Sequence, residues 1–155
     1  MYERLIIANK NKRILIAKDK KRPLGFFSHI EKETLKNDNF RKVINTSKNS
    51  QLVLMSLKPH EDIGNEVHHV DQFFRFESGE GKVILNDGEE VFRIHDGDSV
   101  TVPAGTKHNV INTSDTKDLK LYTIYSPPEH KPGDIKKTKK EATEAEENRR
   151  KLNAH

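Results

Sequence analysis

The sequence predicts an all-β fold, a small barrel or sandwich with added segments at both ends. Between Gln51 and Tyr125, short runs rich in β-branched and aromatic residues recur at intervals of about 8 to 12 residues, with Gly or Pro between them. A length of 155 residues is typical of one domain with one core. Because hydrophobic residues are 32% and charged residues 34%, we expect that core in the middle and solvated ends.

Residues 1–50 are expected to form an N-terminal hairpin and a strap that pack on the barrel or extend it. Two apolar runs, residues 5–8 and 14–17, flank the polar stretch NKNKR, which indicates a hairpin. The mixed segment at residues 26–44 reads as a short helix or as a strap across a sheet. Because a sheet edge exposes unpaired backbone groups, the hairpin could extend a sheet across a homodimer.

Residues 51–127 are expected to form the barrel itself. A compact β-type run, QLVLMSL, opens this region, and the NDG at residues 86–88 is a strong signal for a hairpin turn. The remaining predicted strands are QFFRF, KVIL, EEVFRI, DSVTVP, HNVIN and LKLYTIY. Many short strands joined by turns favour a barrel or sandwich over alternating strands and helices.

Residues 128–155 are expected to form a linker and a helical tail. Thr138 and Glu141 have the spacing of a capping box, and the stretch that follows has acids early and bases late, which suits the helix dipole. Its apolar content is too low to bury much. We therefore expect a helix on the surface.

Composition excludes several classes of function. The net charge is +4, with basic ends and an acidic middle, but the basic runs KDKKR and KKTKK lack the interleaved aromatics that would indicate nucleic-acid binding. Without cysteine there is neither a disulfide framework nor thiolate chemistry. The apolar runs are too short for a signal peptide or a membrane span, so we expect a soluble, cytoplasmic protein with no membrane partner.

The stretch EVHHVDQ, residues 66–72, concentrates metal-competent groups. Read as a strand, it places Glu66, His68 and Gln72 on one face and His69 on the other, because side chains alternate. Farther along, GDSVTVPAGTKHNVIN fits the pattern G-x5-P-x-G-x2-H-x3-N without a mismatch, and its histidine is His108.

That second segment resembles motif two of the cupin superfamily, and the first resembles a degenerate motif one, G-x5-H-x-H-x3-4-E-x6-G. Glu66 stands at the first His position, His68 at the second and Gln72 at the Glu position. The longer text is similar to a group of small bacterial cupins, sometimes labelled mannose-6-phosphate isomerase-like, that have Glu and Gln at these places. That group commonly has four residues between His and Gln where this chain has three, so His68 or His69 could match; the shared phase favours His68.

The resemblance implies a cupin jelly-roll β-barrel that holds one divalent metal ion through Glu66, His68, Gln72 and His108. Imidazole, carboxylate and amide donors suit Fe, Mn, Ni, Co or Zn, and two His with one carboxylate is the donor set of non-haem iron sites. An amide is a poor ligand, so Gln72 is as well suited to hydrogen-bonding a water or a substrate.

Three functions are compatible with this site. The first is Lewis-acid chemistry of an isomerase or epimerase type on a small polar, carbohydrate-like molecule, with Glu66 moving the proton. Tyr122 and Tyr125 are candidate acid/base groups on opposite strand faces, so at most one serves, and we select Tyr122. The second is an Fe(II) oxygenase. The third is a non-catalytic sensor whose basic ends or terminal helix dock to a partner.

Overall fold

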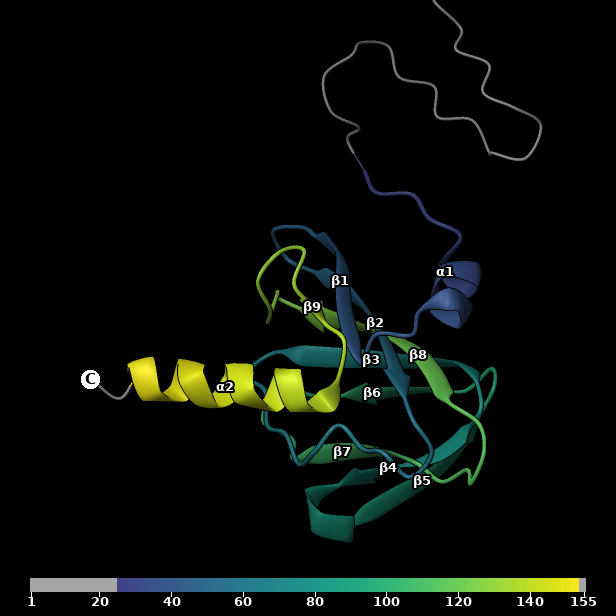
Figure 1. Ribbon diagram of the computed structural model, residues 1–155. Helices are drawn as coiled ribbons and strands as arrows, with labels where there is room; N and C mark the ends of the chain where they lie inside the picture. Colours follow the sequence, from purple (N-terminus) through teal and green to yellow (C-terminus); the bar gives the residue numbers. More distant parts are fainter. Residues whose placement is uncertain (1–24, 154–155) are drawn as a thin grey trace, which may run out of the picture.

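A computed structural model describes residues 25–153, and the predicted hairpin at residues 5–17 lies outside this range. Two antiparallel sheets face each other (Figure 1). The larger sheet has the order β6-β3-β8-β2-β1-β9 and the smaller one β5-β4-β7. The strands are β1 Arg41–Thr46, β2 Gln51–Leu57, β3 Asp71–Ser78, β4 Glu80–Leu85, β5 Glu90–His95, β6 Ser99–Val102, β7 His108–Asn112, β8 Leu119–Ser126 and β9 Ile135–Lys136. The predicted all-β jelly-roll class is confirmed.

The strand pattern of the sequence is reproduced closely. Alternation of buried and more exposed side chains along β8 directs Leu121, Thr123 and Tyr125 into the barrel and leaves Tyr122 outside. The predicted NDG turn is also confirmed, as a short 3-10 turn at Asn86–Gly88 between β4 and β5. The strand β1 precedes residues 51–127 in the sequence, and β9 follows them. Because β1 pairs with β2 and β9 pairs with β1, both strands extend the larger sheet at the same edge.

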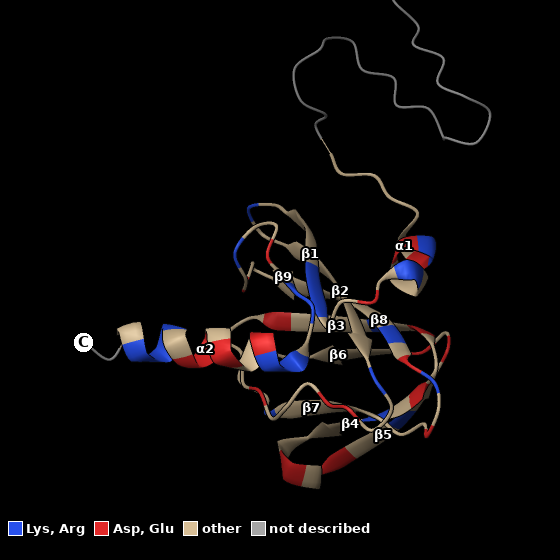
Figure 2. Ribbon diagram, in the orientation of Figure 1, with Lys and Arg blue, Asp and Glu red and all other residues tan. Residues whose placement is uncertain are grey.

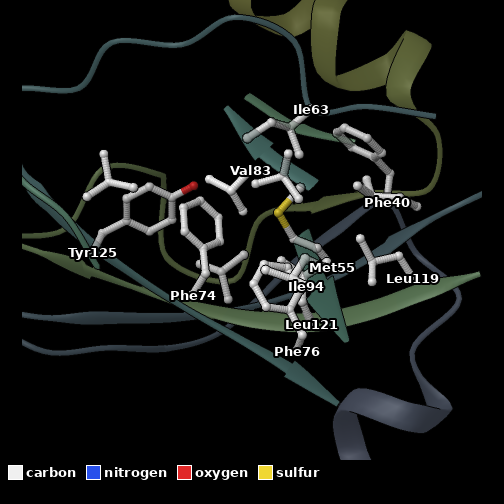
Figure 3. Close-up of a cluster of buried hydrophobic side chains, with 14 of the residues drawn as sticks. Phe40, Met55, Ile63, Phe74, Phe76, Val83, Ile94, Leu119, Leu121 and Tyr125 are labelled. Carbon is white, nitrogen blue, oxygen red and sulfur yellow. The ribbon is translucent and has the colours of Figure 1, made fainter. Parts of the chain in front are cut away.

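The core lies between the two sheets (Figure 3). Phe74 and Phe76 from the larger sheet meet Val83 and Ile94 from the smaller one, and all four side chains are buried. Tyr125 lies at one end of this cluster beside Phe74. Burial of aromatic and branched side chains from both sheets closes the barrel, since apolar area removed from water contributes about 25 cal/mol per Å².

The last residue of motif two, Asn112, ties two other segments of the chain to the end of β7. Its buried amide donates hydrogen bonds to the carbonyl oxygens of Leu57, Lys58 and Lys117 at 3.0, 3.0 and 2.7 Å. These bonds hold the end of β2 and the loop before β8 against the end of β7. Asn112 therefore supports the barrel, while the histidine of the same motif faces its interior.

Both helices pack outside the barrel. The mixed N-terminal segment contains α1, Ile30–Lys36, which packs on the outer face of β8 and β3. The tail contains α2, Lys139–Asn153, whose single residue classed as buried is Ala142. The capping prediction is confirmed, because the Glu141 amide donates to Thr138 Oγ1 at 3.2 Å. Charged residues make up much of α2, which begins at the barrel and projects outward from it (Figure 2). Neither of these two helices, within residues 25–153, is long and apolar enough to cross a membrane.

One local prediction was wrong: residues 66–72 do not form a single strand. Glu66 makes an isolated bridge with His108 of the smaller sheet, and β3 begins at Asp71 in the larger sheet. Residues 67–70 therefore cross from one sheet to the other. A segment that crosses in this way cannot pair regularly with either sheet.

Candidate metal centre

Three of the four predicted ligands meet inside the barrel. One donor atom each from Glu66, His68 and His108 lies within 4.8 Å of the other two. Donors bound to one ion at about 2.1 Å are separated by about 3 to 4 Å, so small side-chain rotations bring all three onto a common ion. The backbones of Glu66 and His108 are fixed to each other by two hydrogen bonds, both 2.9 Å long.

His108 is held in the form a metal requires. Its ring is buried, and Nδ1 lies 3.0 Å from the carbonyl oxygen of Thr106, which fixes the proton on Nδ1. The other ring nitrogen, Nε2, is buried without a hydrogen-bond partner among the residues that the structure describes. Burial lowers the pKa of His108, so its imidazole is neutral near pH 7 with a free lone pair on Nε2.

His68 faces Glu66 across the centre. Its Nε2 lies 3.0 Å from Glu66 Oε2. Burial opposes protonation of His68, but the hydrogen bond to Glu66 and the charges of Glu66 and Glu129 outweigh it and raise the pKa. The carbonyl of His68 accepts a hydrogen bond from Gly105 at 2.8 Å, which anchors the segment to motif two. His69 is exposed, so the structure places His68, and not His69, in this cluster.

Gln72 lies in the barrel interior but outside the three-residue cluster. Its side chain is 1% exposed, and its amide nitrogen donates to Thr123 Oγ1 at 3.0 Å. The amide oxygen Oε1 is buried and has no hydrogen-bond partner within residues 25–153. Gln72 can therefore offer an acceptor to a bound molecule or to an ion.

The tyrosine at the centre is Tyr125, not the selected Tyr122. Tyr122 points outward and contacts Phe73, with ring centroids 6.5 Å apart. Tyr125 points inward and meets the ring of His68 edge-on, with centroids 5.5 Å apart. Burial, and then the negative charge of Glu66, raises the pKa of Tyr125 well above its ordinary value. Its hydroxyl therefore stays protonated and can act as a donor.

Two residues beyond the last barrel strand complete the surroundings, and sequence reasoning missed both. Glu129 Oε1 lies 3.6 Å from His68 Nδ1. The ring of His130 packs edge-on against Tyr125 at 5.0 Å, and burial together with the charge of Arg41 lowers the pKa of His130 to about 3. Neither residue falls in a cupin motif, so only the path of the chain after β8 could have revealed them.

A barrel of two facing antiparallel sheets with two imidazoles and a carboxylate inside fits the cupin class. The cupin domain family model matches residues 53–125, and the chain belongs to the cupin superfamily. It is 48% identical over 109 residues to uncharacterized protein L612 of Acanthamoeba polyphaga mimivirus, covering 69% of this chain and 68% of that protein. It is 44% identical over 130 residues to uncharacterized protein YrkC of Bacillus subtilis, covering 81% of this chain and 69% of that protein.

A solved structure agrees with this membership. The crystal structure of BH2720 from Bacillus halodurans is similar with a TM-score of 0.75 and 41% identity, over 78% of this chain and 95% of that one. The names of these three proteins state no substrate, so the site itself must supply the functional argument.

Proposed function

We propose that this protein binds one divalent metal ion through Glu66, His68 and His108 and uses it on a small polar molecule in the barrel. The observation that carries the proposal is the Nε2 atom of His108, which is buried without a hydrogen-bond partner among residues 25–153 and belongs to a cluster with a second imidazole and a carboxylate. A buried acceptor without a partner costs about 1–3 kcal/mol, and a metal ion removes that cost. Gln72 is a fourth donor by proposal, through the amide oxygen that nothing else in the described chain engages.

The donor set restricts the metal to a group of ions. Two imidazoles and a carboxylate, with no thiolate, suit Fe, Mn, Ni, Co or Zn. When bound, such an ion supplies Lewis acidity toward a carbonyl or hydroxyl oxygen. With Glu66, His68 and His108 alone as protein ligands, coordination positions stay open for Gln72 and for a substrate.

The residues around the centre support proton transfer. Glu66 presents a carboxylate that can accept a proton from a carbon next to a carbonyl group and return it. Tyr125 keeps its proton and can donate a hydrogen bond to a substrate oxygen. These roles fit an isomerase or epimerase reaction on a carbohydrate-like molecule. A proton leaves a carbon next to a carbonyl group and returns to the neighbouring carbon in an isomerase, or to the same carbon in an epimerase.

A second function is favoured by the composition of the site. Two His and one carboxylate are the ligands of non-haem Fe(II) oxygenases, which leave positions open for dioxygen and substrate. Oxygen consumption by the Fe(II)-loaded protein, across the same panel of compounds, would select this function over isomerisation.

The test of the leading proposal is metal-dependent turnover. The chelated protein is incubated with sugar phosphates and nucleotide sugars, and product is followed by NMR before and after one divalent metal at a time is restored. We expect turnover only with metal, its loss in His108→Ala, and its retention in His69→Ala, a matched control at an exposed histidine next to the site. Full turnover by the chelated protein would defeat the proposal.

We also propose that the protein is a homodimer. Phe26 and Phe27 are 49% and 53% exposed beside Val43 and Ile44 of β1, and a contiguous exposed apolar patch is typical of a protein–protein interaction site. Sedimentation at micromolar concentration tests this. A dimer that dissociates in a Phe26→Ser, Phe27→Ser double variant is expected, and a wild-type monomer would contradict the proposal.

A further inference from the structure

Glu129 links His68 to the C-terminal helix. Its Oε1 atom lies 3.6 Å from His68 Nδ1 and 3.7 Å from Nη2 of Arg149 on α2. The Arg149 guanidinium is held in turn by Glu146, one turn earlier on the helix, at 2.8 Å. The side chains of His68 and Glu129 are 12% and 19% exposed, so their interaction is largely shielded from water, whereas Arg149 is 54% exposed.

The backbone at Glu129 is fixed from inside the barrel. Gln51 on β2 is fully buried, and its Oε1 accepts hydrogen bonds from the amides of Glu129 and His130 at 3.3 and 2.9 Å. Its Nε2 donates to the carbonyl of His130 at 2.7 Å. A buried side chain that satisfies three polar groups of one turn leaves that turn little freedom, so the Glu129 carboxylate is held at His68.

α2 is attached at two points that bracket the segment carrying the proposed ligands. Near its start, Lys139 pairs with Asp62, which also accepts a hydrogen bond from Asn109 at 2.8 Å. Near its end, Arg149 pairs with Glu129, the partner of His68. The rise between Lys139 and Arg149 is about 15 Å on an α-helix, so these two ion pairs hold α2 over most of its length.

We propose that Glu129 and Arg149 are positioning residues of the metal centre. Glu129 accepts the Nδ1 hydrogen of His68, which leaves Nε2, the atom that faces Glu66, as the metal-binding nitrogen. Arg149 holds the carboxylate in place. At 3.6 Å, a small rotation of the imidazole brings the pair to hydrogen-bond length. A carboxylate behind a ligand histidine fixes the tautomer and the ring orientation and raises ligand basicity.

This inference rests on the proposed metal binding, and cobalt binding tests the two separately. Chelated full-length protein is titrated with Co²⁺, and the affinity and the visible absorption bands are recorded. Glu129→Ala is expected to weaken Co²⁺ affinity about 10- to 100-fold and to shift the bands, because loss of such an outer partner typically has that effect. Glu129→Gln keeps an acceptor for the Nδ1 hydrogen and is expected to recover much of the affinity.

The role of α2 is tested by substitutions at two neighbouring arginines. Arg149→Ala is expected to weaken Co²⁺ binding about threefold or more, whereas the control Arg150→Ala, an exposed residue with no ion pair among residues 25–153, stays within about twofold of wild type. Thermal unfolding of each metal-free variant shows that the fold is retained.

Each outcome has one meaning. If the wild type binds no Co²⁺, the proposed function fails. If the wild type binds Co²⁺ and both Glu129→Ala and Arg149→Ala match its affinity and spectrum, metal binding stands and the positioning role is overturned. Should Glu129→Ala not fold, Glu129→Gln and Arg149→Ala decide: wild-type affinity and spectrum in Arg149→Ala would overturn the role of the helix.

Discussion

Acidification should destabilise this protein through His130, and His130→Gln should remove that part of the effect. The folded protein holds the imidazole buried beside Tyr125, where burial and the charge of Arg41 lower its pKa from 6.5 to about 3. The unfolded chain has no such constraint and takes up a proton near pH 6.5. Between these two pKa values the unfolded state binds more protons, so stability falls as the pH falls.

The magnitude follows from the two pKa values. At pH 7.5 both states hold a neutral imidazole and His130 contributes no pH dependence. At pH 5 the unfolded state is protonated and the folded state is not, and the gap of about 1.5 pH units corresponds to about 2 kcal/mol. Near pH 3, where the loss of stability caused by His130 is complete, it would reach about 5 kcal/mol. For a chain of this length, 2 kcal/mol lowers the melting temperature by about 4–8 °C.

Urea unfolding of metal-free wild type and His130→Gln, at pH 7.5 and pH 5, measures this contribution. Gln has a similar size and cannot take up a proton, so titration of every other group is common to both proteins. We expect the wild type to lose about 2 kcal/mol more than the variant between the two pH values. Parallel losses in the two proteins would refute the reasoning and show that His130 is protonated in the folded state.

Three further predictions concern the barrel and its site. Phe74→Ala, which empties a fully buried position between the sheets, should cost about 3–5 kcal/mol in urea unfolding, and a loss under 1 kcal/mol would mean that the site collapses around it. Tyr125→Phe should slow turnover about 10²-fold or more while Co²⁺ affinity is retained, whereas Tyr122→Phe on the outer face should change neither; equal effects would reverse the assignment. Saturation with divalent metal at about 100 times the dissociation constant should stabilise the wild type by about 2.7 kcal/mol in urea unfolding, and His108→Ala should show no such gain.

Much of the fold could be predicted because strand periodicity and turns are local signals. The barrel strands and the NDG turn follow from short alternating runs and from Asn-Asp-Gly, and the start of α2 follows from Thr138 and Glu141. The segment at residues 66–72 could not be predicted as it folds, because its crossing between sheets depends on which sheets its neighbours join. Local sequence carries no record of that pairing.

The residues of the site also divide into those that local sequence predicts and those that it does not. Motif two indicated His108. Glu66 and His68 were indicated by their separation of two residues, which places both side chains on one face of a strand. Strand alternation places Tyr122 and Tyr125 on opposite faces without stating which face is inward, so the sequence could not decide which of the two lies inside the barrel. Glu129 and His130 reach the centre through the turn after β8, held by Gln51, and side chains that meet through a turn leave no periodic trace in a sequence.

Metal content tests the central claim most directly. Elemental analysis by mass spectrometry of purified wild type, Glu66→Ala, His108→Ala and His69→Ala measures the ion per chain. The account predicts close to one transition metal ion per chain in the wild type and in His69→Ala, and loss of that ion in the other two. Wild-type metal content in His108→Ala, or a metal-free wild type that takes up no divalent ion after reconstitution, would contradict it.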